Sequence, residues 1–368
     1  MTKRQEVFDV VIVGATPAGG AAGIRARQAG LSCLMIEPDP WPRQKTHLDW
    51  LGPRGVEFCR TCGLGGSAVG AAEFAGVCLR SWDLSRETRV EEEGLAGWIV
   101  DRAGFEMALI DRAIAAGAVL RPEAQPQGLS LGEEHAKLLL GDGAEIRGRI
   151  LLIGDGLNSR VSALARLMTA RESEGVAAAV TADFEGTAAA PQLDVIIGAR
   201  RSPQTVTILR SGPRGRVVLL TRELSPTPQE QFREFLELAR SAGLLPADWR
   251  GQPAVATSPA GVALEMETLI GKRCLQIGET GGFVAAFSNE VLYPEMQSGW
   301  LAAETAERAL RAGVLQDELQ SFSVAWRAEL AEYLRLPNTD LALLMPLVFN
   351  NAQMSARVAR AFLLGQGF

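Results

Sequence analysis

Two glycines near the start of the sequence have a spacing suited to binding a phosphate group. Gly14 follows the apolar run Val7–Val13, and the segment from Gly19 to Gly30 is alanine-rich and helical in character. A buried strand that turns directly into a helix leaves the first backbone N–H groups of the helix unpaired, and the helix dipole adds a partial positive charge there. Gly14 allows the tight turn, and Gly19 lets the helix pack closely on the strand. The sequence therefore predicts a phosphate site at the start of this helix.

A carboxylate follows at the distance that a dinucleotide requires. The second apolar run, Leu31–Ile36, ends at Glu37, which can accept hydrogen bonds from ribose hydroxyl groups. Strand, helix, strand and acid in this order form the βαβ arrangement that binds dinucleotides. Thr16 departs from the pattern, because it occupies the position of the second glycine, which lets the backbone approach the pyrophosphate. We expect a dinucleotide site whose loop binds the phosphates less tightly.

The proline-rich segment 38–53 leaves the predicted ribose-binding strand and carries candidates for acid–base chemistry. His47 is the first of them, because its unperturbed pKa lies near neutrality, and Asp49 could orient it. The alternative is a histidine that only hydrogen-bonds the loop. Trp50 and, late in the chain, Tyr293 either line a substrate pocket or fill the core.

Two further charged residues stand at the ends of predicted elements. Asp101 is a natural N-cap for a helix over Ala103–Ala116, and Arg102 at the start of this helix opposes the dipole unless it binds an anion. The predicted strand Glu145–Ile153 runs into Gly-Asp-Gly, which places Asp155 at the sheet edge where α/β proteins bind ligands. Asp155 either anchors the next helix or takes part in the chemistry.

Length, charge and hydropathy narrow the class of protein. A chain of 368 residues exceeds the size at which one core usually keeps growing, so we expect two interleaved domains. The net charge of -6 and the pI of about 5.3 argue against a general nucleic-acid binder. The N-terminus shows no apolar signal segment, and the late apolar run Leu341–Phe349 contains Pro346 and is too short to span a bilayer. We expect a cytoplasmic protein for which membrane association is improbable.

The cysteines and histidines do not indicate a disulfide framework or a metal site. The cysteines number five, which is odd, and Cys59 and Cys62 form a CxxC at the end of a predicted helix. This pair is either a redox centre or two small core residues. With only His47 and His135 in the sequence, no zinc site is expected.

The rest of the sequence predicts an inserted sheet and a helical tail. Residues 175–263 contain short strand-like runs separated by turn signals, which is typical of a mainly antiparallel domain. The first domain then resumes with a buried strand and a long helix over 295–312. Residues 315–368 predict amphipathic helices broken at Pro337 and Pro346. These helices either pack over the inserted domain or lie on a membrane surface.

Three segments together resemble a known family. They are the glycine-rich turn with Glu37, the Gly-Asp-Gly-x-x-Ser motif at 154–159, and a late strand that ends in Glu279 before two glycines and a long helix. The pattern resembles the FAD-dependent oxidoreductases of the glutathione-reductase type, and most of all their geranylgeranyl reductase and aromatic hydroxylase branch. Residues 278–299 follow the reductase signature Gly-Asp-Ala-Ala-Gly-Phe-Val-x-Pro-x-x-Gly-x-Gly-Ile without a gap. The resemblance covers nearly the whole chain.

The resemblance implies FAD laid across the sheet edge, with NAD(P)H as a transient reductant. It places Gly14 and Ala18 at the pyrophosphate with Arg102 nearby. It places Glu37 on the adenosine ribose and Glu279 on the ribityl side. The cofactor-binding residues it implies are Gly14, Ala15, Pro17, Ala18, Gly19, Glu37, Pro38, Lys45, Arg102, Asp155, Glu279, Gly282 and Asn289.

The resemblance also implies the fold. We expect an α/β protein with a Rossmann-like FAD-binding domain, an inserted antiparallel β-sheet substrate domain and a C-terminal helical segment. The expected boundaries are 1–80, 99–168 and 264–312 for the FAD-binding domain, 81–98 and 169–263 for the substrate domain, and 313–368 for the C-terminal helices.

The sequence departs from the family pattern near the flavin ring. The family's aspartate is Glu279, and its two loop glycines are Asn289 and Val291. Prenyl reductases carry Lys-Pro-Cys-Gly-Gly-Gly where residues 45–50 here read Lys-Thr-His-Leu-Asp-Trp, so His47 replaces the cysteine. These differences weaken the case for prenyl reduction and predict a reshaped substrate pocket.

Four functions remain open at this stage. The first is a monooxygenase-like tailoring enzyme that uses FAD, NAD(P)H and O2 on a small apolar or aromatic substrate. The second is a flavoprotein that modifies a tryptophan or related side chain on a protein partner. The third is a prenyl-type double-bond reductase. The fourth is a binding protein that has lost FAD, as Thr16, Asn289 and Val291 in place of glycines would allow.

Overall fold

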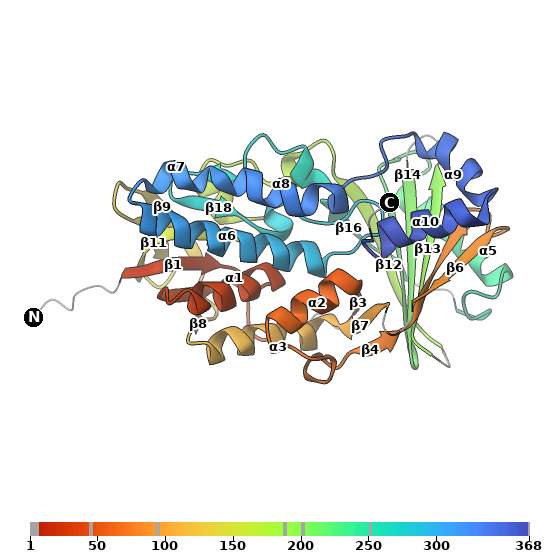
Figure 1. The fold of residues 1–368 in the computed structure, drawn as a ribbon, viewed down its shortest axis with the longest axis horizontal. Helices are drawn as coiled ribbons and strands as arrows, with labels where there is room; N and C mark the ends of the chain where they lie inside the picture. The colour runs from red at the N-terminus through yellow and green to blue at the C-terminus, as the bar shows by residue number, and fades with distance from the viewer. Residues whose placement is uncertain are drawn as a thin grey trace, which may run out of the picture.

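The structure is a computed structural model, and it describes residues 7–43, 47–92, 94, 96–186, 190–199, 203–249 and 252–366. The chain forms two parts that lie side by side (Figure 1). One part has helices layered on a parallel sheet, and the other is built on long antiparallel strands. The C-terminal helices extend from the first part to the second.

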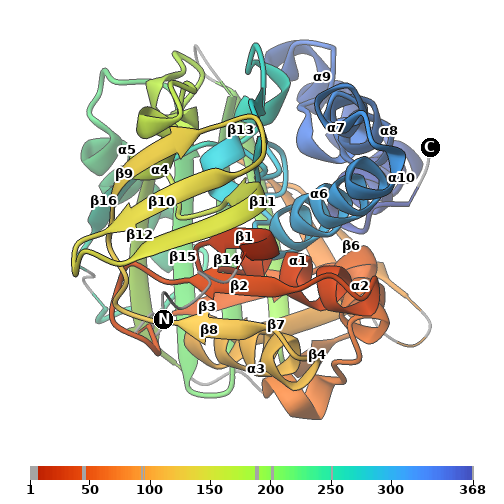
Figure 2. The same ribbon diagram turned by 90° about the vertical axis from the view of Figure 1, so that its left-hand side faces the viewer.

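The first part is built on a sheet whose central strands are parallel. Within the described residues its strands are β1 (Val7–Val13), β2 (Cys33–Ile36), β8 (Val119–Arg121), β9 (Pro126–Leu131), β10 (Ala136–Leu140), β11 (Glu145–Ile153), β17 (Ile270–Gly271) and β18 (Cys274–Gln276). Their order is β17-β18-β11-β1-β2-β8, and the β9–β10 hairpin continues from β11 (Figure 2). Strands β18, β11, β1, β2 and β8 run parallel, so their carboxyl ends share one edge. In α/β proteins this edge binds ligands.

Three helices stack on one another beside this sheet. Helix α1 packs between α6 and α3. A Cβ on Gly299 would lie only 2.0 Å from the Ala18 carbonyl oxygen, so this glycine permits the close approach of α6 to α1. The helices and short 3-10 turns of this part are α1 (Pro17–Gln28), α2 (Pro53–Thr61), α3 (Arg102–Ala115), α4 (Arg160–Leu164), α6 (Leu292–Ala312), η1 (Gly66–Val69), η2 (Ala170–Glu172), η3 (Val262–Leu264) and η4 (Gly278–Gly281).

The predicted βαβ unit and the predicted helix after Asp101 are confirmed. Gly14 has a φ of 108°, which an L side chain rarely adopts, and its N–H donates to the Ile36 carbonyl at 2.7 Å. A Cβ on Gly19 would lie 2.0 Å from the Gly14 carbonyl oxygen, as expected for close helix–strand packing. Asp101 caps α3 by accepting from the Gly104 N–H at 3.3 Å.

The second part is the predicted, mainly antiparallel sheet, whose one parallel pair in the described structure joins β5 and β13. Among the described residues its strands are β5 (Gly76–Ser81), β6 (Glu87–Glu91), β12 (Ala177–Glu185), β13 (Gln192–Ala199), β14 (Pro203–Ser211), β15 (Arg214–Thr221) and β16 (Ala254–Ser258). Their order is β16-β12-β15-β14-β13-β5-β6. The sheet takes up β5 from Gly76 onward, ahead of the boundary expected at 80/81, because β5 pairs with β13.

The two faces of this sheet differ because side chains alternate along a strand. Val206 and Ile208 of β14 pack with helix α5 (Pro228–Ser241) in one core. Thr207 and Leu209 of the same strand point the other way and line a cavity that faces the first part. A small sheet, β3 (Leu48–Leu51), β7 (Gly97–Asp101) and β4 (Ala72–Phe74), lies between the two parts.

The tail forms helices that pack on both parts. Helices α7 (Leu315–Leu319) and α8 (Ser321–Leu334) pack on α6, α9 (Leu341–Phe349) contacts β13, and α10 (Ala352–Leu363) contacts β5 and β6. The interpretation that the tail packs over the inserted domain is therefore confirmed for α9 and α10, whereas α7 and α8 pack on the first part. No helix in the described part of the chain is both long and apolar enough to cross a membrane.

The predicted break at Pro346 is wrong. Pro346 lies inside α9, which begins at an Asp340 cap. The proline removes one backbone hydrogen bond. Leu341, Met345 and Val348 are nevertheless buried in the core between the tail helices and the antiparallel sheet, and their burial favours the helix. The break near Pro337 is confirmed, because α8 ends at Leu334 and α9 begins at Leu341.

Candidate cofactor and substrate site

The turn between β1 and α1 is held by polar contacts to its neighbours. Thr16 caps α1, because its hydroxyl oxygen accepts from the Gly19 N–H at 3.2 Å. The same hydroxyl donates to the Gly154 carbonyl at 3.1 Å. The Ala15 N–H donates to the Glu37 carboxylate at 2.7 Å. Thr16 therefore ties the turn to the end of β11, and Glu37 ties it to the end of β2.

Glu37 is fully buried, and its carboxylate is surrounded by donors. Besides Ala15, the Asp39 N–H donates to it at 2.9 Å and the Arg43 guanidinium at 2.6 Å. Glu37 stands at the end of β2, where the sequence placed a ribose-binding acid. In the structure Arg43 occupies one side of that carboxylate.

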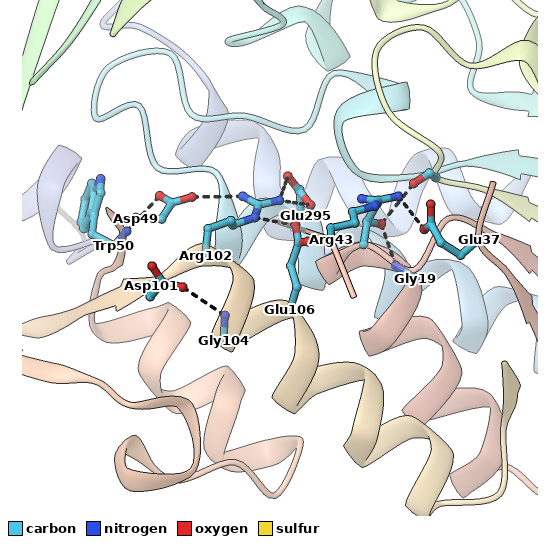
Figure 3. A network of polar contacts seen from close by, with 12 residues as sticks. Gly19, Glu37, Arg43, Asp49, Trp50, Asp101, Arg102, Gly104, Glu106 and Glu295 are labelled. Carbon is cyan, nitrogen blue, oxygen red and sulfur yellow. Dashed lines mark hydrogen bonds and ion pairs between the residues drawn. The ribbon is translucent and has the colours of Figure 1, made fainter. Parts of the chain in front are cut away.

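Arg102 is buried at the start of α3 and contacts three carboxylates (Figure 3). Its Nε donates to Glu106 at 2.7 Å, one Nη donates to Asp49 at 3.0 Å, and the other contacts both oxygens of Glu295 at 3.2 and 3.4 Å. Burial alone would lower the pKa of Arg102, but the carboxylates of Glu295, Glu106 and Asp49 together raise it well above its ordinary value. The anion predicted at Arg102 is thus supplied, in this structure, by the chain's own side chains.

A narrow cavity of about 130 Å³ lies at the sheet edge between these groups. Asp155 borders it. Burial raises the pKa of the Asp155 carboxyl to about 6, although hydrogen bonds from Ser159 and from the Val161 backbone act to lower it. These bonds anchor the start of α4. One Asp155 oxygen and the Nε of Arg43 have no hydrogen-bond partner among the described residues. The lining residues are Thr16, Asp39, Arg43, Arg102, Gly154, Asp155, Gly156, Glu279 and Glu295.

A second cavity of about 240 Å³ lies between the two parts of the molecule. Glu279 lines both cavities, so they meet at this side chain. His47, Asp49 and Trp50 form part of the wall of the larger one. The His47 carbonyl accepts from the Arg102 N–H at 2.9 Å, which fixes the loop. The Asp49 carboxylate accepts from the Trp50 N–H at 2.9 Å and from Arg102 at 3.0 Å.

The opposite wall of the larger cavity is the antiparallel sheet, and it is partly polar. Thr181, Thr207 and Arg216 project from β12, β14 and β15. Thr207 is 1% exposed, and its hydroxyl has no hydrogen-bond partner in the described structure. Arg216 is paired with Asp183 at 2.9 Å. The cavity thus offers hydrogen-bonding groups as well as apolar surface.

The remaining predicted cofactor residues that the structure describes are Pro17, Pro38, Gly282 and Asn289. Pro17 is at the first turn of α1, and the Pro38 carbonyl accepts from Gln125 at 2.6 Å. Asn289 adopts a φ of 55° and borders the larger cavity. Gly282 has a φ of 79°, and a Cβ there would lie 2.6 Å from the Ala263 backbone nitrogen, so close packing explains this glycine. Lys45 lies outside the described residues.

Tyr293 lies in the core, edge-on to Phe58 and Tyr333, at centroid distances of 6.2 and 5.1 Å. Of the two interpretations of Tyr293, core filling describes its placement. Next to it Glu290 is fully buried and accepts from the Tyr333 hydroxyl and, at 3.0 Å, from the Gly52 N–H. Burial raises the pKa of Glu290 to about 8 despite these two donors.

The CxxC does not have the features of a redox centre. Cys59 and Cys62 are buried free cysteines, and burial raises the pKa of both thiols, that of Cys62 to about 12. A reactive cysteine requires the opposite, an accessible thiol of lowered pKa. The second interpretation, two small core residues, fits this structure.

Sequence reasoning missed several residues of this site. The pairing of Arg102 with Glu106 could have been predicted from the sequence, because residues four positions apart on a helix lie on the same face. Nothing local indicated the pairing with Glu295, 193 positions away. The further residues that the structure adds are Arg43, Glu290, Thr181, Thr207 and Arg216.

A parallel sheet with this glycine turn, an acid after β2 and a late strand ending at the same edge defines a dinucleotide-binding fold. The family model described as FAD binding domain matches residues 7–237, and the chain belongs to this family. It is an FAD-dependent oxidoreductase of the branch that includes geranylgeranyl reductases and flavin monooxygenases.

Individual relatives agree in fold and differ in chemistry. The chain is 23% identical to a digeranylgeranylglycerophospholipid reductase of Methanocaldococcus jannaschii, over 91% of this chain and 86% of that one. It resembles the structure of a geranylgeranyl bacteriochlorophyll reductase-like protein from Thermoplasma acidophilum, with a TM-score of 0.76, 16% identity and coverage of 97% and 96%. It also resembles the structure of a flavin-dependent brominase, with a TM-score of 0.72 and 16% identity, over 96% of this chain and 90% of that one.

The residues at the sheet edge fit FAD in chemistry. Thr16 at the start of α1 and the unpartnered atoms of Arg43 and Asp155 border the narrow cavity, and Glu37 is reached through its ion pair with Arg43. Arg102 and Glu279 would then hold the pyrophosphate and the ribityl chain. The ring end would point toward the larger cavity, at the Glu279 side chain that lines both cavities. The point of conflict is Glu295, whose carboxylate stands beside Arg102.

Proposed function

We propose that the protein is a monooxygenase-like tailoring enzyme that uses FAD, NAD(P)H and O2 on a compact substrate with an aromatic or apolar body and at least one hydrogen-bonding group. The observation that carries this proposal is the larger cavity. Its volume of about 240 Å³ is below the roughly 300–1,000 Å³ typical of pockets for drug-sized ligands. A long prenyl chain would exceed this space, which disfavours the prenyl reductase alternative.

The chain's own residues would position the substrate and move protons. Bound FAD would supply the redox step, while the protein supplies orientation, electrostatics and exclusion of water. Thr207 would hydrogen-bond the polar group of the substrate from the sheet side. His47, on the opposite wall, is the candidate to donate or accept a proton.

The test is turnover of purified protein loaded with FAD. We expect oxidation of NADH or NADPH to be stimulated by small hydroxylated aromatic compounds and not by a prenyl lipid. Product formation is expected to require O2. Product formation under anaerobic conditions would instead favour a reductase. A protein that retains no flavin under any condition would favour the binding-protein alternative.

A second candidate function is modification of a side chain on a protein partner. An outer groove of about 710 Å³ shares Leu48 with the larger cavity and is lined by Phe184, Pro246, Trp249 and Arg214, among others. This groove could hold a polypeptide while one side chain reaches inward. Stimulation of NAD(P)H oxidation by tryptophan-containing peptides, and not by free aromatic compounds, would support this function over the first.

A further inference from the structure

The Glu295 carboxylate stands where the fold would bind the phosphates of a dinucleotide. Glu295 lies in the first turns of α6 and borders the narrow cavity together with Thr16, Gly154 and Gly156. A Cβ on Gly278 would lie 2.9 Å from the Ala18 Cβ and 3.9 Å from a Glu295 oxygen. The carboxylate is therefore adjacent to the start of α1, where backbone N–H groups and the helix dipole favour an anion.

Of the three carboxylates on Arg102, Glu295 makes the longest contact. Glu106 and Asp49 accept from separate nitrogens at 2.7 and 3.0 Å. Both oxygens of Glu295 share a single nitrogen at 3.2 and 3.4 Å. Longer, shared hydrogen bonds are weaker than short, linear ones. By hydrogen-bond geometry Glu295 is thus the partner that Arg102 holds least tightly, although its carboxylate has the largest electrostatic effect on Arg102.

The charges around the cavity make such an exchange necessary for a diphosphate. Among the described residues, seven carboxyl groups gather at or next to this cavity, and two guanidinium groups, Arg43 and Arg102, stand against them. The carboxyl groups are those of Glu37, Asp39, Asp49, Glu106, Asp155, Glu279 and Glu295. A diphosphate adds negative charge beside Glu295, and like charges in a desolvated site repel strongly. The Glu295 carboxylate and a diphosphate therefore compete for one guanidinium nitrogen.

We propose that Glu295 is an internal ligand of Arg102 that FAD must displace, so that this glutamate sets the affinity of the protein for its cofactor. Arg102 keeps its hydrogen bonds to Glu106 and Asp49 throughout. The nitrogen that donates to Glu295 would donate to the pyrophosphate instead. This inference rests on the proposed function, because it presumes that FAD binds along the sheet edge.

The experiment compares the wild type with E295Q, which keeps the size of the side chain and removes its charge. Dissociation constants for FAD and ADP, which carry a diphosphate, and for riboflavin and adenosine, which do not, would be measured by calorimetry or by flavin fluorescence. We expect E295Q to bind FAD and ADP about tenfold to a hundredfold more tightly, the scale of one charge-assisted hydrogen bond, and riboflavin and adenosine unchanged.

Two further variants complete the test. E295D keeps the charge but shortens the side chain, and is expected to tighten FAD binding less than E295Q does. E307Q removes a carboxylate of the same helix that pairs with Arg25, away from the cavity, and should leave all four constants unchanged. The urea midpoint of each variant reports whether it is folded.

The outcomes separate the two proposals. Equal FAD affinity in the wild type, E295Q and E295D would overturn the role of Glu295 and leave an FAD-dependent function standing. A uniform gain for all four ligands in E295Q would also overturn it, because the effect would not depend on the diphosphate. Folded wild type and E295Q that both fail to bind FAD and ADP would overturn the proposed function, and this inference with it.

Discussion

The Thr16 hydroxyl donates to the Gly154 carbonyl at 3.1 Å and so joins the first βα turn to the end of β11. It also caps α1 by accepting from the Gly19 N–H. The side chain that replaces the family's second glycine therefore has two structural partners. It occupies the point where a pyrophosphate would approach the backbone.

Replacing Thr16 with glycine should weaken the fold and strengthen cofactor binding. T16G loses the bridge to Gly154 and the side-chain cap, so we expect the free energy of unfolding to fall by about 1–2 kcal/mol. FAD binding should tighten, because the backbone becomes accessible. Urea unfolding and FAD titration measure the two effects. T16S keeps the hydroxyl and should match the wild type in both, whereas weaker FAD binding by T16G would contradict this account of the turn.

Removing the cation from the buried cluster should be far more costly. R102M leaves Asp49, Glu106 and Glu295 without their shared guanidinium, and breaking a buried ion pair in this way costs about 3–5 kcal/mol. R25M removes an arginine that pairs with Glu304 and Glu307 nearer the surface, where such pairs contribute about 0–1 kcal/mol. Urea unfolding curves of both variants test the contrast. Similar losses for the two would show that the cluster does not depend on Arg102.

The contrast between Asp101 and Arg102 shows how far sequence reasoning reaches. Asp101 was predictable as a helix cap, because capping depends on residues within one turn, and the structure confirms it. The expectation that Arg102 binds an anion followed from its conflict with the helix dipole, a local effect. Its partners Asp49 and Glu295 are 53 and 193 positions away, and only the packing of β3, α3 and α6 brings them together.

The inserted sheet shows the same limit. Short strand-like runs separated by turn signals predicted antiparallel strands, and they are confirmed. Which face of β14 meets the first part was not predictable, because Thr207 and Val206 are both buried. The sequence therefore could not distinguish a cavity-lining threonine from one in a core. Tyr293 kept two interpretations for a related reason, because a buried aromatic residue near a predicted site can either line a pocket or fill the core.

Glu290 should make stability depend on pH. Burial raises its pKa in the folded protein to about 8, from an ordinary value of about 4.5. Between these values the folded state holds a proton that the unfolded state has released. Stability is therefore highest below the lower pKa and falls as pH rises toward the upper one, by at most about 1.4 kcal/mol per pH unit.

The measurement is urea unfolding of the wild type and E290Q from pH 6.5 to 8. Asp155, with a pKa raised to about 6 by burial, has largely finished titrating there, so this window isolates Glu290. We expect the wild type to lose stability with rising pH and E290Q to show a flatter profile. E304Q, a partly exposed glutamate, should behave as the wild type does. Parallel profiles for the wild type and E290Q would show that Glu290 is ionised in the folded protein at neutral pH.

Thr207 should bind substrate without contributing to the fold. A buried hydroxyl without a partner costs about 1–3 kcal/mol, so T207V is expected to be as stable as the wild type or more stable. T305V is a matched control, because the buried Thr305 hydroxyl donates to the Leu301 carbonyl at 2.9 Å and its loss should cost about 1 kcal/mol.

For a substrate that stimulates NAD(P)H oxidation, T207V should raise KM with a smaller change in kcat, since a hydroxyl on the far wall contributes to binding in both ground and transition states. An unchanged KM would place the substrate's polar group elsewhere, and a loss of stability equal to that of T305V would mean that Thr207 has a structural partner after all.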